Sequence, residues 1–284
     1  MKTNNIDNLR QRITDRIIEQ LETCESSDYS QPWFTLGEIP KNAVTHKQYH
    51  GINTLWLGLS GFNTLEFATY KQWESIGAQV QKGSKGYPVI FYKALKIKDK
   101  VTEEDKTIPL MRYSTVFNCS QVDGYEPKII PLNDNKSIEH VDSFIYNSGI
   151  NIKHGFDRAC FIPSINQVHM PELGQFKDTN NYYSVLFHEL THATGHKSRL
   201  DRNMNGCYGG KDYAYEELIA ELGSAFNMGS LKLDSTPRDD HAIYIKSWLR
   251  ILRKDNKFIF SAAAKAQAAL DYLVEMQEKN RRAA

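Results

Sequence analysis

The chain has 284 residues, enough for two domains or one large one, and its hydrophobic (40%) and charged (24%) fractions are ordinary for a soluble globular protein. Its formal net charge of +1 excludes a global positive field that would by itself indicate a nucleic-acid partner. There is no run of about 18 apolar residues and no apolar signal core, so we expect a cytoplasmic protein without a membrane partner. The cysteines are scattered without a C-x-x-C pair, which is typical of reduced thiols: Cys24, Cys119, Cys160 and Cys207.

The first half of the chain, residues 1–132, mixes helical and strand patterns and predicts a small α+β domain. A short helix is expected to begin after Thr69, its N-cap, and to close at Gly77. The other predicted elements are an amphipathic helix over residues 6–21, a helical stretch near 55–59, strands at 87–93 and 113–118, and a charged hairpin tip over 98–106.

Lysines and aromatic residues are interleaved between Lys71 and Lys100. Seven lysines occur in this stretch, against only Glu74 and Asp99. Ammonium groups can contact phosphates, and aromatic rings can stack on bases at ~1–3 kcal/mol each, so the pattern suits a single-stranded nucleic acid. The alternative is a set of core aromatic rings with a solvated fringe of lysines.

The second half, residues 133–284, is predicted to be mostly helical. The polar stretch from Asn133 to Ser137 is the predicted linker, and a helix is expected to end near Gly149. A short strand ahead of a catalytic helix can form the edge of a cleft and pair with an extended peptide. The remaining predicted elements are strands at 159–163 and 167–171 and helices around 243–252 and 261–277.

The clearest chemical signal lies between Ser184 and His196, in the pattern His-Glu-x-x-His. His188 and His192 are four residues apart, so they lie on one face of a helix and can bind one Zn²⁺ at ~2.0–2.1 Å. Glu189 can act as a general base toward water. The neighbouring residues are apolar, which predicts a buried helix.

A catalytic zinc has three protein ligands and one open position, so the third ligand must come from another segment. On a helix over residues 213–226, Glu217 and Glu221 share an apolar face, whereas Glu216 is expected to point toward water. Two carboxylates on an apolar face need a compensating charge, which Zn²⁺ supplies. We assign Glu217 as the third ligand and Glu221 as the residue that holds a histidine ring by its second nitrogen.

Alternatives to this assignment remain open. The roles of Glu217 and Glu221 could be exchanged, or the buried carboxylate could form a salt bridge to Arg199 or Arg202. His196 is a rival ligand, although the metzincin pattern needs a histidine three residues after the glycine of this motif.

Oxyanion stabilisation needs a further hydrogen-bond donor. Tyr213 and Tyr215 are candidates because they are close to the glutamates in sequence.

Segments from both halves carry a family resemblance. They are residues 49–53, 77–86 and 116–124 in the first half, and 188–196, 198–200 and 216–221 in the second. In the right order and over nearly the whole chain, they resemble the ArdC-type antirestriction proteins of plasmids and other mobile elements. The resemblance implies an N-terminal single-stranded-DNA-binding domain (residues 1–132) and a C-terminal zincin-like metallopeptidase domain (residues 133–284), similar to Spartan-type DNA-dependent proteases.

We therefore expect an antirestriction protein that binds single-stranded DNA and has a gluzincin-like zinc site, with a protein as a further potential partner. The residues expected to contact DNA are Lys82, Lys85, Lys93, Tyr92 and Trp73. Two other functions remain open: a non-catalytic DNA-binding shield with a structural or vestigial zinc site, and a zinc peptidase that acts independently of DNA.

Overall fold

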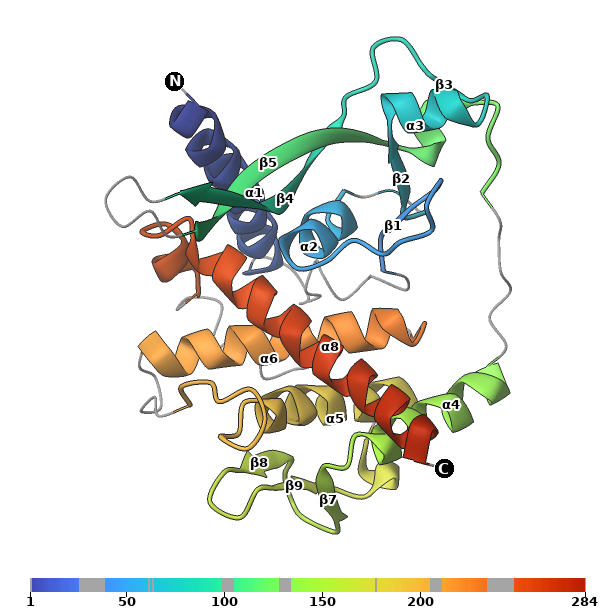
Figure 1. The fold of residues 1–284 in the computed structure, drawn as a ribbon. Coiled ribbons are helices and arrows are strands. Elements are labelled where there is room, and N and C mark those ends of the chain that lie inside the picture. Colours follow the sequence, from blue (N-terminus) through green and yellow to red (C-terminus); the bar gives the residue numbers. More distant parts are fainter. Residues whose placement is uncertain are drawn as a thin grey trace.

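The computed structural model describes residues 2–25, 39–60, 62, 64–98, 105–127, 134–176, 178–204, 211–233 and 248–283. The predicted α+β fold is confirmed: a sheet with flanking helices forms one part, and a mostly helical part with a small sheet forms the other (Figure 1). A search of the described helices finds none that is long and apolar enough to cross a membrane.

The first part contains one long helix, a pair of long antiparallel strands and several shorter elements. In chain order they are α1 (Lys2–Glu25), β1 (Lys41–Asn42), α2 (Ile52–Gly58), β2 (Glu66–Thr69), α3 (Tyr70–Ser75), β3 (Gln79–Val80), β4 (Tyr87–Lys98), β5 (Asp105–Asn118) and β6 (Val122–Asp123). One sheet has the order β1-β2-β5-β4, and β3 pairs with β6 separately. Asn53 in α2 covers the edge strand β4, because its side-chain amide donates to the carbonyl of Ile90 at 2.6 Å and accepts from the N–H of Ile90 at 2.8 Å.

The helices and both strands predicted for this part are present. The elements α1, β4 and β5 extend beyond the predicted residues, whereas α2 ends at Gly58 and α3 ends at Ser75. Thr69 is the N-cap of α3 and accepts a hydrogen bond from the backbone N–H of Gln72 at 3.3 Å, as predicted. The hairpin tip falls mostly on residues 99–104, which lie outside the described residues. Strands β1, β2, β3 and β6 were not predicted, because two to four residues are too few to show a clear alternation.

The second part places the helices α4, α5, α6 and α8 beside a small sheet. Its elements are α4 (Asp134–Asn147), β7 (Asn151–His154), β8 (Cys160–Ile162), β9 (Gln167–Met170), α5 (Thr179–Thr194), α6 (Lys211–Ser230) and α8 (Phe258–Ala283), with a helical segment at residues 248–252. The sheet has the order β7-β9-β8, so β8 is an edge strand, as expected for the strands ahead of the motif helix. In Figure 1, α5, α6 and α8 lie next to one another in the centre of the molecule.

The prediction of a linker from Asn133 to Ser137 is wrong for the part of this segment that the structure describes. Asn133 lies outside the described residues, but residues 134–137 form the first turn of α4. Asp, Asn and Ser favour helix N-termini as well as loops, so the polar composition did not separate the two structures.

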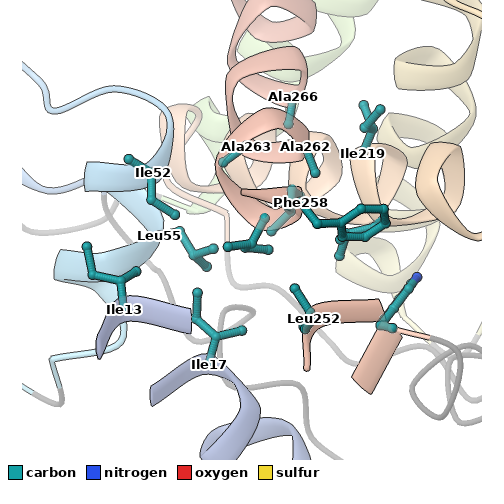
Figure 2. Close-up of a cluster of buried hydrophobic side chains, with 14 of the residues drawn as sticks. Ile13, Ile17, Ile52, Leu55, Ile219, Leu252, Phe258, Ala262, Ala263 and Ala266 are labelled. Atoms are coloured by element: carbon teal, nitrogen blue, oxygen red, sulfur yellow. The ribbon is translucent and has the colours of Figure 1, made fainter. Parts of the chain in front are cut away.

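One hydrophobic core joins the two parts. Ile13 and Ile17 of α1, and Leu55 of α2, pack in the same buried cluster as Ile219 of α6 and Ala263 of α8 (Figure 2). A buried hydrogen bond crosses the same junction, from the backbone N–H of Gly51 to the side-chain oxygen of Gln267 at 3.0 Å. The helices on either side of the expected boundary after residue 132 are therefore held by shared packing.

Candidate metal centre

The motif helix α5 is buried along most of its length. Asp178 is its N-cap and accepts a hydrogen bond from the N–H of Asn181 at 2.7 Å, and Gly195 is its C-cap. His188 (3% exposed) and Glu189 (5%) are buried with the apolar residues around them. The prediction of a buried helix with the motif on it is confirmed.

A glycine sets the distance between α5 and α6. A Cβ atom at Gly223 would lie 2.4 Å from Cγ2 of Thr191 and 2.5 Å from its hydroxyl oxygen, which is well inside van der Waals contact. Only a residue without a side chain fits there, so the two helices approach closely at Thr191, the residue before His192. This contact brings the glutamates of α6 to the histidines of α5.

Three ligand atoms converge between the two helices. The Nε2 atoms of His188 and His192 lie 3.1 Å apart. One carboxylate oxygen of Glu217 lies 3.5 Å from Nε2 of His188, and the other lies 3.7 Å from Nε2 of His192. Among the described residues, these three form the group of His, Cys, Asp and Glu side chains whose ligand atoms are close enough to hold one metal ion.

The second nitrogen of each ring faces another carboxylate of α6. Nδ1 of His188 lies 2.9 Å from Glu221, and Nδ1 of His192 lies 3.3 Å from Glu216. In the neutral rings this places the proton on Nδ1 and leaves the lone pair of each Nε2 directed at the shared point. Three hydrogen-bond acceptors therefore meet there, which is an arrangement that a cation stabilises.

The prediction for Glu216 is wrong. This residue was expected to point toward water, but it is 6% exposed and forms an ion pair with Arg202 at 2.7 Å. The salt bridge considered for Glu217 is thus formed by its neighbour. The missed signal is the run Leu218 to Ala220, three consecutive apolar residues, which indicates a helix buried on every side.

The carboxyl of Glu217 is ionised at neutral pH. Burial alone would raise its pKa, because a buried site disfavours the charged form. When the rings are protonated, His188 can donate from Nε2 to Glu217 and both histidines place positive charge beside it. These interactions, with a hydrogen bond from Tyr213, outweigh burial and lower the pKa to about 2. The side chain is therefore a carboxylate, as a metal ligand must be.

The general-base candidate lies in the same cleft. This cleft has a volume of about 720 Å³, and its lining includes His188, His192, Glu217, Tyr213 and Glu189. The carboxylate of Glu189 accepts a hydrogen bond from the backbone N–H of Phe161 in the edge strand β8 at 2.8 Å. Glu189 is therefore held between the motif helix and the strand at which an extended peptide would pair.

Other predicted residues lie away from this point. The ring of His196 contacts Phe161 and its Nδ1 lies 2.7 Å from the hydroxyl of Ser198, so it is not in the metal-binding group. Of the two tyrosines considered as oxyanion donors, Tyr213 lines the cleft, whereas the hydroxyl of Tyr215 donates to Ser261 of α8.

The residues predicted to contact DNA have different environments. Lys82 and Lys85 are exposed in the turn between β3 and β4. Tyr92 and Lys93 belong to β4, but their side chains lie outside the described residues. The prediction that Trp73 contacts DNA is wrong. The residue is 0% exposed, and its indole N–H donates to the carbonyl of Phe117 at 3.1 Å. Trp73 is therefore a core residue whose ring has no free face for a base.

An exposed aromatic ring that was not among the predicted contacts lies near the lysine turn. Tyr70, at the start of α3, is 45% exposed. Its hydroxyl accepts a hydrogen bond from Gln79 of β3 at 2.8 Å, and β3 leads directly to the turn that carries Lys82.

Comparison with known proteins assigns a class to each part of the chain. Residues 139–265 match the family described as zincin-like metallopeptidase. Residues 7–117 match the N-terminal domain of the anti-restriction factor ArdC. The protein therefore joins an ArdC-type N-terminal domain to a zincin-like metallopeptidase domain.

Solved structures identify the family over the whole length. The metal-free crystal structure of the antirestriction protein ArdC from the R388 plasmid is 35% identical to the chain with a TM-score of 0.78, covering 95% of this chain and 98% of that one. Its Mn(II)-bound structure is 36% identical with a TM-score of 0.76, covering 94% and 97%. The chain belongs to the ArdC-type antirestriction proteins, which confirms the resemblance seen in the sequence.

Two further relatives are bacterial proteins. Protein y4eC of Sinorhizobium fredii (strain NBRC 101917 / NGR234), which is uncharacterized, is 40% identical over 288 residues, covering 96% of this chain and 93% of y4eC. DNA primase TraC of Escherichia coli is 35% identical over 290 residues, covering 95% of this chain and 27% of TraC. The chain thus spans about a quarter of that primase. The zincin-like class and the Mn(II)-bound relative together support a divalent metal in this family.

Proposed function

We propose that this protein is an antirestriction factor that binds single-stranded DNA through residues 1–132 and has a zinc-dependent peptidase site in residues 133–284. The observation that supports the peptidase site most strongly is the convergence of three acceptor atoms, two imidazole nitrogens and a carboxylate oxygen, in the cleft that also contains the carboxylate of Glu189. The proposed partners are single-stranded DNA and a protein substrate, and the proposed location is the cytoplasm.

The residues present fit a zinc ion. Tetrahedral bonds of ~2.0–2.1 Å put neighbouring ligand atoms about 3.4 Å apart. The Nε2 atoms of His188 and His192 are 3.1 Å apart, and the two carboxylate oxygens of Glu217 lie 3.5 and 3.7 Å from them, one oxygen near each ring. With one ligand atom taken from each residue, all three atoms lie within 4.8 Å of one another. Two neutral imidazoles and one carboxylate are also the ligand types of the gluzincin-like catalytic sites, which leave one position open.

A bound Zn²⁺ would supply Lewis acidity, which polarises a water molecule and the scissile carbonyl. Glu189 acts as the general base, since its carboxylate faces the cleft and can take a proton from the attacking water and return it to the leaving amine. Tyr213 is the proposed donor to the developing oxyanion, because it lines the cleft and already hydrogen-bonds Glu217. The edge strand β8 aligns the peptide.

Single-stranded DNA binding is assigned to the lysine turn and its aromatic neighbour. Lys82 and Lys85 are exposed, and their ammonium groups can contact phosphates. Tyr70 replaces Trp73 as the proposed stacking ring near the turn, because Trp73 is buried. Tyr92 and Lys93 remain proposed contacts on β4.

Exchange of Glu189 for Gln tests the proposed reaction. The amide keeps the size of the side chain but is not basic, so Glu189→Gln retains metal and fold and loses cleavage of a casein substrate, measured with and without a single-stranded oligonucleotide. Unchanged cleavage by this variant contradicts the assignment of the base. Absence of cleavage by the wild-type protein under every condition favours the DNA-binding shield, and cleavage unaffected by oligonucleotide favours a DNA-independent peptidase.

A further inference from the structure

Arg202 links the end of the motif helix to α6 through four hydrogen bonds. Its Nη2 donates to a carboxylate oxygen of Glu216 at 2.7 Å and to the carbonyl of Thr191 at 2.6 Å. Its Nε donates to the other oxygen of Glu216 at 3.2 Å, and its Nη1 donates to the hydroxyl of Thr194 at 2.8 Å. The side chain is 5% exposed, and all three nitrogens of its guanidinium donate inside the protein.

The partner of Arg202 also reaches one of the motif histidines. Oε1 of Glu216, which accepts from Arg202, lies 3.3 Å from Nδ1 of His192. A buried carboxylate that holds the second nitrogen of a metal-binding histidine fixes the tautomer and the angle of the ring. Because Arg202 holds both oxygens of Glu216, the carboxylate cannot rotate away from His192.

Gly195 leaves space for the guanidinium of Arg202 because it has no side chain. A Cβ atom at Gly195 would lie 2.8 Å from Nη2 of Arg202 and 2.9 Å from the sulfur of Met204. The backbone φ of Gly195 is −74°, which any residue can adopt, so glycine is needed here for space and not for conformation. The glycine that follows the motif therefore lets the guanidinium cross the helix end.

We propose that Glu216 and Arg202 are a positioning pair that orients the ring of His192 for metal binding, in parallel with the contact between Glu221 and His188. This inference rests on the proposed metal site and adds a pair of residues to it that do not touch the metal. Loss of either member leaves His192 free to turn, so the metal dissociates more readily.

Metal affinity of the full-length protein tests the pair. Zn²⁺ is titrated in competition with a chromophoric chelator, and the visible spectrum of the Co²⁺-loaded protein reports the ligand geometry. Glu216→Leu and Arg202→Met each weaken metal binding by about 10–100-fold, the range for such partners of metal ligands. Arg202→Lys weakens it almost as much, since one ammonium cannot replace the fork, and Glu216→Gln weakens it less, since the amide oxygen still accepts from Nδ1.

The controls separate positioning from general stability. Glu275→Gln and Arg282→Ala change exposed charges of α8 and leave the affinity at the wild-type value. The double variant Glu216→Leu/Arg202→Met loses no more affinity than the worse single variant, because the residues act as one unit. Where Glu216→Leu or Arg202→Met fails to fold, Glu216→Gln and Arg202→Lys carry the test, with nitrogen NMR shifts of His192 reporting its tautomer.

Two results overturn the inference in different ways. Folded variants of Glu216 and Arg202 that bind Zn²⁺ within about twofold of the wild-type affinity and leave the Co²⁺ spectrum and the His192 shifts unchanged refute the pair alone, and the metal site stands. A wild-type protein that binds neither Zn²⁺ nor Co²⁺ refutes the proposed metal site and the pair with it.

Discussion

The close approach of α5 and α6 at Gly223 makes Gly223→Ala the most informative single change outside the ligands. The new methyl group would lie 2.4 Å from Cγ2 of Thr191, whereas non-bonded carbons are at their best at about 3.5–4.0 Å. Thr191 cannot turn away, because its hydroxyl donates to the carbonyl of Phe187 at 2.7 Å and a β-branched side chain has few rotamers in a helix. The helices must then move apart by about 1 Å or more.

This movement has two measurable consequences. Overpacking of this kind costs roughly 1–3 kcal/mol of unfolding free energy. At roughly 2–4 °C per kcal/mol for a chain of this size, the Tm of the metal-free protein falls by about 2–12 °C. A metal site tolerates shifts of only about ±0.2 Å in its ligand distances, so Zn²⁺ affinity falls as well, because Glu217 moves away from the two histidines with α6.

Thermal unfolding with and without Zn²⁺ measures the first effect, and chelator competition measures the second. Gly174→Ala is the matched control, since a Cβ atom there meets nothing within 4 Å. Thr191→Ala removes the side chain that the new methyl group meets, so the double variant Thr191→Ala/Gly223→Ala recovers part of both losses. A Tm within about 1 °C of wild type for Gly223→Ala, or no recovery in the double variant, would refute the packing argument.

Three further changes separate the metal site, the lysine turn and the core. Glu217→Gln replaces the ionised ligand with a neutral amide, so Zn²⁺ affinity falls, which equilibrium dialysis followed by metal analysis detects. Lys82→Ala/Lys85→Ala lowers the salt dependence of single-stranded oligonucleotide binding by about 0.7 per lost phosphate contact, and an unchanged slope removes these lysines from the interface. Trp73→Phe loses the hydrogen bond to Phe117, so it lowers stability by about 1 kcal/mol but leaves the oligonucleotide affinity of the folded protein unchanged.

The sequence could predict the motif helix and two of the three glutamates that α6 presents to it, because both predictions depend on local periodicity. His188 and His192 share a face through spacing alone, and Glu217 and Glu221 share a face for the same reason. The structure brings the first three of these side chains to one point. Their joint use needed no information about distant parts of the chain beyond the assumption that the two helices meet.

Sequence patterns could not show contacts that depend on where segments meet in space. Arg202 comes 14 residues before Glu216, and residues 205–210 between them lie outside the described residues, so no periodic pattern connects the pair. Trp73 was misplaced for a related reason: an aromatic residue among lysines has the same local pattern whether its ring packs inward or outward. The cross-strand and interhelical neighbours decide between these two outcomes.

The shared core changes how the two parts of the chain should be viewed. The family matches end at residue 117 and begin again at residue 139, on either side of the boundary expected after residue 132. Yet α6 presents its glutamates to α5 on one side, while Leu218 and Phe226 of the same helix pack in the cluster that contains Ile13 and Leu55 (Figure 2 shows the latter pair). Removal of residues 1–132 would expose this apolar surface, so the position of the ligand helix depends on the fold of the N-terminal part. The candidate metal centre therefore depends on both parts of the chain, and its metal affinity is measured on the whole protein.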